Sequence, residues 1–390
     1  MRKIWKGFTA CLLAGAMMAG LSACSSGSAN SASQASSSSA ASKVESESVS
    51  TSSESTEEAS KETNTASAEA ESTSETSQER EIMGSTEATD VNVGLIMGPP
   101  SMGLGWFINE AKNGNTYNNF NMTVDGIDYS ALSAELNENT YQIITCPSNV
   151  AAILYNNEDL QCDVKVISIN NTGLLYIVTT DPSIQSLEDL KGRTVYSIGE
   201  GGPPEYTFEY LMEKTGMSED VNLSFRSTPF EVVNLLQDEE NSIALLPQPF
   251  VEVAKLLVEN LNVPIDITDE WDKCNTDSNA ESITTVSIVR KDFLEEHEQA
   301  VIEYLKMAKQ STDYTLEHVD EAAAWTEEFE TFLNPEVAVD AIPQCNICTI
   351  TGEEMKEKLS GFIDIMYNFN SDAVGGSIPD DDFYYIPPEE

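Results

Sequence analysis

The sequence contains only two histidines and is poor in basic residues, and both shortages exclude classes of function. His297 and His318 lie in the charged segments "LEEHEQ" and "LEHVDE", where we expect solvated positions on helix faces. A Ser-His or Cys-His nucleophile would need its base in a cleft. Lys and Arg number 20 against 66 Asp and Glu, which disfavours nucleic acid and anionic lipid surfaces as partners.

Common cofactor motifs are also missing. Gly199-Glu200-Gly201-Gly202 is followed by two prolines, so the third glycine of a dinucleotide loop is absent. Ser101 stands in "PPSMG", which does not match the G-x-S-x-G turn that presents a nucleophilic serine. We therefore predict a protein that is not an enzyme, with no cofactor and no metal site.

Cysteine is scarce, with seven in the chain, of which five lie beyond residue 90: Cys146, Cys162, Cys274, Cys345 and Cys348. An odd number leaves at least one thiol unpaired within this part. Cys345 and Cys348 form a C-x-x-C, but zinc would need a second pair. We expect "CNICTIT" to be extended and the next helix to begin near Thr351, which leaves a local disulfide or two free thiols as alternatives.

The first 24 residues have the features of a secretion signal. Basic residues at positions 2, 3 and 6 precede the apolar run "FTACLLAGAMMAGL", and "LSAC" ends at Cys24. The segment resembles the lipobox of bacterial lipoproteins, in which the cysteine thiol is acylated and becomes the N-terminus. This resemblance implies a lipid anchor at Cys24 on the outer face of the cell membrane; an ordinary signal peptide is the alternative.

Residues 25–90 are mainly Ser, Glu, Thr and Ala, with thirteen acidic and three basic residues. This segment has too few large apolar side chains to offset, by burying them, the conformational entropy lost on folding. We therefore predict a disordered tether. From residue 91 on, 14 Lys/Arg and 53 Asp/Glu give a body with a formal charge of −39. Its length of about 300 residues suits two lobes.

In the body, apolar strand patterns alternate with helical patterns through short loops. This alternation predicts α/β sheets covered by helices, with ligands bound beyond the carboxyl ends of strands, at helix N-termini. Four loops have that position: 98–103, 146–149, 199–205 and 247–249. Trp106 and Tyr206 follow two of these loops within the first helical turns, which makes them candidates for lining a pocket.

The body resembles extracytoplasmic substrate-binding proteins of ABC importers, in the nitrate/sulfonate/taurine and thiamine-precursor (NMT1-like) group. The resemblance rests on "SLEDLKGRTVYSIGEGGPPEYTFEYLMEKTG", "IALLPQPFVEVA" and "IITCPSNVAAILYN" and spans most of residues 91–370. It implies a type II periplasmic-binding-protein fold, in which two α/β lobes with mixed sheets close over a ligand by a hinge motion. We place lobe one at 91–180 and 284–390, and lobe two at 181–283.

The same resemblance implies a monomer that captures a small-molecule solute and delivers it to an ABC permease in the membrane. The residues that it implies for ligand binding are Ser101, Met102, Trp106, Ser148, Asn149, Gly201, Gly202, Tyr206 and Gln248. Two alternatives are an envelope enzyme of the same fold and a receptor that signals to a membrane sensor.

The four loops depart from sulfonate and nitrate binders in their charge. None contains Lys or Arg, whereas Glu200 and Glu205 lie in or beside the third loop. This disfavours an inorganic oxyanion and favours a neutral, aromatic or partly cationic solute, although helix dipoles alone can bind anions. The cysteine-rich iron site and sacrificial histidine of thiamine-pyrimidine synthases have no counterpart here.

Overall fold

A computed structural model describes residues 87–126, 129–276, 278–332 and 334–388. All of the described residues belong to one compact unit. The predicted signal peptide, Cys24 and nearly all of the predicted tether lie outside the described residues.

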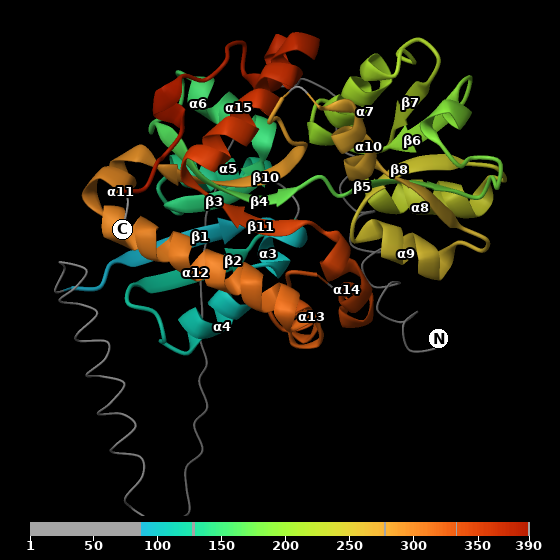
Figure 1. The fold of residues 1–390 in the computed structure, drawn as a ribbon. Coiled ribbons are helices and arrows are strands. Elements are labelled where there is room, and N and C mark those ends of the chain that lie inside the picture. Colours follow the sequence, from blue (N-terminus) through green and yellow to red (C-terminus); the bar gives the residue numbers. More distant parts are fainter. Residues whose placement is uncertain (1–86, 127–128, 277, 333, 389–390) are drawn as a thin grey trace, which may run out of the picture. The chain divides into compact units, whose positions relative to one another are not determined.

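The first sheet has six strands in the order β11-β4-β10-β3-β1-β2 (Figure 1). Its strands are β1 (Asp90–Leu95), β2 (Asn119–Val124), β3 (Ile143–Pro147), β4 (Val164–Thr172), β10 (Ile283–Arg290) and β11 (Ile347–Ile350). Its helices are α3 (Pro99–Met102), α4 (Gly105–Lys112), α5 (Tyr129–Asn137), α6 (Ser148–Asn156), α11 (Lys291–Glu296), α12 (Glu298–Glu317), α13 (Val319–Glu328), α14 (Pro335–Ala341) and α15 (Gly352–Phe369).

The second sheet has five strands in the order β7-β6-β8-β5-β9. Its strands are β5 (Leu175–Thr179), β6 (Thr194–Ser197), β7 (Asn222–Phe225), β8 (Ile243–Pro247) and β9 (Asn262–Asp266). Its helices are α7 (Pro203–Lys214), α8 (Pro229–Asp238), α9 (Phe250–Leu257) and α10 (Ile267–Cys274). Short 3₁₀ helices lie at η1 (Leu187–Leu190), η2 (Ile342–Gln344), η3 (Ser371–Val374) and η4 (Asp381–Phe383).

The two sheets share one topology. Without the added edge strand β11, each sheet contains three parallel strands, then one strand antiparallel to both of its neighbours, then a last strand. The antiparallel strand is β10 in the first sheet and β5 in the second. The chain crosses from one sheet to the other just before each of these strands. It leaves the first sheet after β4 and joins the second at β5, and it leaves the second after β9 and α10 and returns to the first at β10. The mixed two-sheet α/β fold predicted from the sequence is therefore confirmed.

The first crossing between the sheets lies earlier than the sequence suggested. We placed residues 91–180 in lobe one, but β5 (Leu175–Thr179) pairs with β8 and β9 in the five-stranded sheet. The chain crosses at Gly173 and Leu174. A side chain at position 173 would place its Cβ 2.9 Å from the hydroxyl oxygen of Thr268, so the crossing needs glycine. The apolar pattern of β5 identifies a strand, but it does not say which sheet the strand joins.

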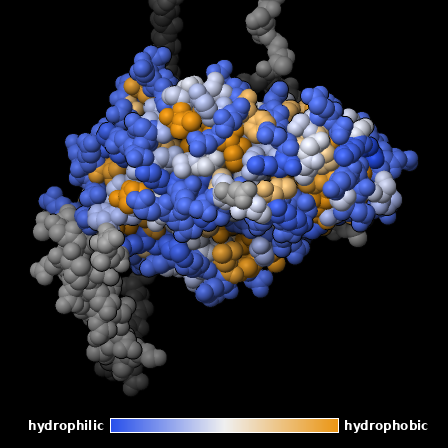
Figure 2. Space-filling model, turned by 45° about the horizontal axis from the view of Figure 1, so that its top comes forward, coloured by the Kyte–Doolittle hydropathy of each residue, from blue (hydrophilic) through white to orange (hydrophobic). Residues whose placement is uncertain are grey.

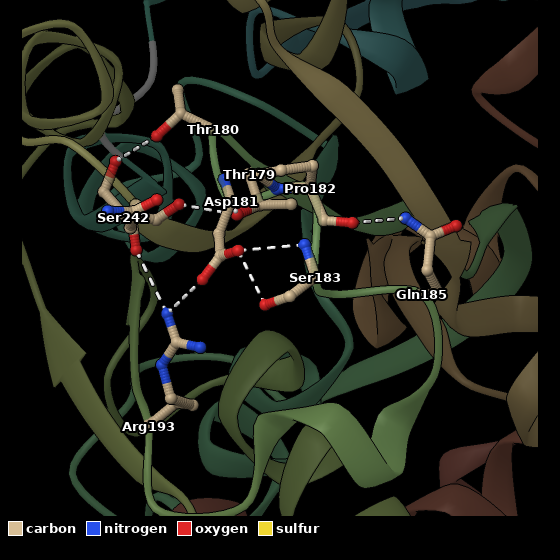
Figure 3. Close-up of polar contacts among 9 residues, drawn as sticks. Thr179, Thr180, Asp181, Pro182, Ser183, Gln185, Arg193 and Ser242 are labelled. Atoms are coloured by element: carbon tan, nitrogen blue, oxygen red, sulfur yellow. Dashed lines mark hydrogen bonds and ion pairs between the residues drawn. The ribbon is translucent and has the colours of Figure 1, made fainter.

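Local capping starts the elements of the second sheet. Ser186 and Asp189 form the predicted capping box around η1, and Thr228 accepts a hydrogen bond from the Glu231 amide at the start of α8. Just before η1, Asp181 accepts hydrogen bonds from the Ser183 amide and hydroxyl and from Arg193 (Figure 3). These contacts fix the chain as it leaves β5.

The apolar cores follow the two faces of each sheet. On the six-stranded sheet, α4 and α12 cover one face and α5, α6 and α15 the other (Figure 1). On the five-stranded sheet, α8 and α9 pack against one face and α7 and α10 against the other. One cluster includes Ile144 and Val166 of the first sheet together with Ile177 and Val195 of the second, so the two sheets share a core.

The face of the molecule drawn in Figure 2 is mainly hydrophilic, with hydrophobic side chains in small scattered groups. This agrees with a body in which acidic residues far outnumber basic ones. Within residues 87–388, apart from the few that are not described, no helix has both the length and the apolar character that a membrane crossing requires.

Candidate functional site

Each of the four predicted ligand loops joins a strand to a helix. β1 leads to α3, β3 to α6, β6 to α7 and β8 to α9. The strands β1 and β3 are parallel neighbours, and so are β6 and β8, so the two loops of each sheet lie at one edge. The carboxyl ends of parallel strands are the expected place for a ligand in sheets of this kind.

Four of the predicted residues meet where the two sheets' helices touch. The side-chain amide of Asn149, at the start of α6, donates to the Gly201 carbonyl at 3.0 Å and to the Ala373 carbonyl at 3.3 Å. Gly201 and Gly202 lead into α7, on which Tyr206 is 3 % exposed. Asn370 donates to the Tyr206 hydroxyl at 3.4 Å. This group, Asn149, Gly201, Gly202 and Tyr206, therefore joins the two halves of the body.

Two predicted ligand residues have a buried oxygen without a hydrogen-bond partner. They are Oδ1 of Asn149 and Oε1 of Gln248, and these residues are 5 % and 3 % exposed. The amide orientations are consistent, because the nitrogen of Asn149 faces two carbonyls and that of Gln248 donates to a Glu252 carboxylate oxygen at 3.0 Å. Leaving a buried acceptor unsatisfied costs about 1–3 kcal/mol, so both oxygens call for a donor from outside the chain.

The start of α7 is shaped by glycine and by its own carboxylate. Gly199 has a φ of 78°, and a Cβ there would lie 2.9 Å from Cγ of Pro204, so the turn into the helix needs glycine. The Gly201 amide donates to the Glu205 carboxylate. We expected free amides here to receive a ligand, but this one is occupied by an acidic side chain in the first turn. An anionic ligand group at this helix start would meet that negative charge.

A pocket of about 520 Å³ lies beside Gln248. Its walls come from the five-stranded half and from α14 and η2, and it is lined by Tyr176, Gln248, Val251, Glu252, Lys255, Val263, Asp340 and Gln344. Glu252 is 8 % exposed, and one of its oxygens accepts from both Gln248 and Lys255, the latter at 2.8 Å.

Tyr176 connects the two walls of this pocket. It lies on β5, and its hydroxyl donates to the Gln344 carbonyl at 3.3 Å. Burial, followed by the negative charge of Asp266, raises the pKa of Tyr176, so its hydroxyl stays protonated and remains a donor. The hydroxyl contact therefore holds the Tyr176 ring in place in the lining of the pocket.

The two predicted serines and Met102 are more enclosed than we expected. The Ser101 hydroxyl donates to the Gly98 carbonyl at 3.0 Å, and the Ser148 hydroxyl donates to the Ile283 carbonyl at 2.6 Å. Both residues are fully buried. Met102 packs with Val253 and Ile342 in an apolar cluster near the pocket. These hydroxyl protons are already used within the chain.

Trp106 lies apart from the other predicted residues. It is half-buried, and its ring stacks on Tyr314 of α12 with centroids 6.0 Å apart. Tyr314 in turn stacks on Trp325 of α13 and on His318. His318 and His297 lie at junctions between consecutive helices, where the backbone leaves the helical conformation, and not within helix faces.

The five cysteines among the described residues are free thiols. Cys345 is buried, and Cys348 follows it on β11 without forming a disulfide. The helix after them begins at Gly352, which agrees with the predicted start near Thr351. Burial raises the pKa of the Cys348 thiol to about 12 and also raises that of Cys345, so both thiols are protonated at neutral pH and are poor nucleophiles. Among the described residues, no cluster of acidic, histidine or cysteine side chains is arranged to hold a metal ion.

Sequence reasoning missed most of the pocket lining. Glu252 could have been found, because it stands in the first turn of the helix that follows the "PQP" loop. Asp340 and Gln344 carry no such signal: they lie about ninety residues later and reach the pocket only because α14 packs against α9.

Comparison with known proteins agrees with this fold. Residues 144–322 match the family model described as NMT1/THI5 like. Curated proteins give no match. Among solved structures, an ABC transporter protein from Parabacteroides distasonis is 22 % identical, with a TM-score of 0.62 over 77 % of this chain and 100 % of that one.

Two sulfonate-binding proteins are also similar in structure. The periplasmic aliphatic sulphonate binding protein SsuA from Escherichia coli is 12 % identical, with a TM-score of 0.62 over 78 % of this chain and 94 % of that one. The alkanesulfonate-binding protein SsuA from Xanthomonas axonopodis pv. citri, bound to MOPS, is 11 % identical, with a TM-score of 0.56 over 76 % and 96 %. The chain thus contains an NMT1/THI5-like region and has the fold of periplasmic binding proteins.

Proposed function

We propose that the protein is the solute-binding component of an ABC import system. It captures a small organic molecule between its two halves and delivers it, unaltered, to a membrane permease. The fold, the NMT1/THI5-like region and structural neighbours named as sulfonate-binding proteins support this role. The lobes would be residues 91–174 with 283–388, and residues 175–282, hinged where the chain crosses between the sheets.

The proposed location is the outer face of the cell membrane. The basic start, the apolar run and the "LSAC" sequence support secretion and a lipid on Cys24, and residues 25–90 supply a tether. Such an anchor would hold a monomeric body close to the permease.

The observation that carries the proposal is the pair of buried, unpartnered amide oxygens. Asn149 belongs to the first half and Gln248 to the second, and each residue follows the carboxyl end of a strand. A solute that donates to both oxygens would satisfy them and bridge the halves. Their place after corresponding strands of the two sheets supports a shared role in binding a ligand.

The proposal is tested by thermal unfolding of the purified protein against a library of small metabolites. We expect at least one solute to raise the Tm saturably. Asn149→Ala should then weaken its binding about tenfold, whereas Asn113→Ala, at an exposed position after α4, should not. If no solute stabilises the protein and mass spectrometry finds none retained through purification, the proposal fails.

A further inference from the structure

The pocket between α9 and α14 has more hydrogen-bond acceptors than donors. Gln248 lines it and is 3 % exposed, and its Oε1 has no partner. The matching Nε2 is already used on Glu252. The wall of the pocket therefore contains a buried acceptor, Gln248 Oε1, that no group of the described residues satisfies.

Acidic residues also outnumber basic ones in the lining of the pocket. Glu252 and Asp340 are acidic, and Lys255 is the basic residue among the eight that line the pocket. Lys255 is held at 2.8 Å on the buried Glu252, while its own side chain is 47 % exposed. Asp340 stands on the opposite wall, so the lining has a net negative charge.

The remaining polar groups do not reverse this bias. The Tyr176 hydroxyl is committed to Gln344, and Gln344 presents its own carbonyl and side-chain oxygen to that hydroxyl. A sulfonate or nitrate would therefore meet two carboxylates, and it would have to compete with Glu252 for Lys255, the basic residue of the lining.

We infer that this pocket binds the cationic nitrogen group of a small organic solute, such as an amidinium or a primary ammonium. The group's N–H donors would satisfy Gln248 Oε1 and the Glu252 carboxylate, with Asp340 supplying further attraction and the Tyr176 ring a flat apolar contact. This inference rests on the proposed solute-binding function and gives its substrate a chemical class. It separates this chain from structural neighbours whose names specify sulfonates.

The test compares three probes of similar size: benzamidine, benzyl alcohol and benzenesulfonate, titrated calorimetrically into the full protein. Benzamidine should bind saturably, and about tenfold or more tightly than either of the others, as expected for a charge-assisted contact. Glu252→Gln should weaken benzamidine about tenfold, and Asp340→Asn about threefold through the lost longer-range attraction. Glu259→Gln, an exposed position just beyond α9, should change the Kd less than about twofold.

Two controls keep the outcome clear. Asp340 is exposed, so Asp340→Asn should fold even if Glu252→Gln does not, and the Tm of each variant is measured without probe. The inference is rejected if benzenesulfonate binds more tightly than benzamidine, if benzamidine does not bind, or if neither acidic substitution weakens it. A library solute that depends on Asn149 and carries no cationic nitrogen would keep the transport function and reject this class.

Discussion

The two halves of the body have the same strand order but different charges where they meet a ligand. The helices that begin at the strand ends of the first half, α3 and α6, have no acidic residue in their first turns. Those of the second half, α7 and α9, carry Glu205 and Glu252. The shared topology sets where a ligand site can lie. The side chains at the helix starts, which the topology does not determine, decide which ligand charge the site favours.

The halves also differ in what holds them together. The first sheet has a core of its own, formed with α4 and α12, and the second has one with α8 and α9. The remaining faces merge into one cluster, in which Trp271 of α10 lies 5.8 Å from Phe362 of α15 and 4.5 Å from Tyr210 of α7, measured between ring centroids. Trp271 thus joins elements of both halves.

The largest effect that we predict comes from removing the contacts of Trp271 between the two halves. Trp271→Ala should lower the free energy of unfolding by about 3–5 kcal/mol, because it removes a ring that is 2 % exposed and leaves a cavity. Chemical denaturation measures the loss. Trp106→Ala, which removes the same residue type from a half-buried stack, should cost clearly less. Equal losses would contradict the larger contribution to stability that we assign to Trp271.

A smaller, pH-dependent effect is confined to the second half. Hydrogen bonds from Ser183, followed by Arg193, lower the pKa of Asp181 to about 2 in the folded protein. Its carboxylate therefore stabilises the fold above its ordinary pKa of 3.8, and that stability is lost as the pH falls towards 2. Because Arg193 is partly exposed, we expect Asp181→Asn to cost only about 1 kcal/mol at pH 7.

The cost is measured by denaturation at pH 7 and again near pH 2.5, where it should shrink. Glu219→Gln, at an exposed position in the same half, provides the control and should show no such pH dependence. A cost that is the same at both pH values would contradict the role of the Asp181 carboxylate.

The smallest effect tests the charge difference between the halves. Glu205→Gln should lower stability by about 0.5 kcal/mol, because a carboxylate at a helix N-terminus interacts favourably with the helix dipole. Glu209→Gln, one turn further along α7, should be neutral or slightly stabilising, since burial raises the pKa of Glu209. Urea denaturation of both variants gives the comparison, and equal losses would remove the special role of the first turn.

Much of the fold could be predicted from local patterns. The four strand–loop–helix segments and the start of the last long helix follow from short-range spacing, and the capping box at Ser186 follows from local side-chain hydrogen bonding. The placement of β5 could not, because a buried apolar strand fits either sheet. Trp106 illustrates the same limit, since its position after a ligand loop does not reveal the stack with Tyr314.

The sequence by itself determined the class of the fold, the four loops at strand ends and the excess of acidic over basic residues. These depend on apolar periodicity, turn residues and composition, which act over a few neighbouring positions. The tertiary structure alone decided which loops meet, which amide oxygens lack partners and which walls enclose the pocket. Those features come from packing between elements far apart in the chain: Gln248 and Asp340, for example, line the same pocket, and no local pattern records that they do.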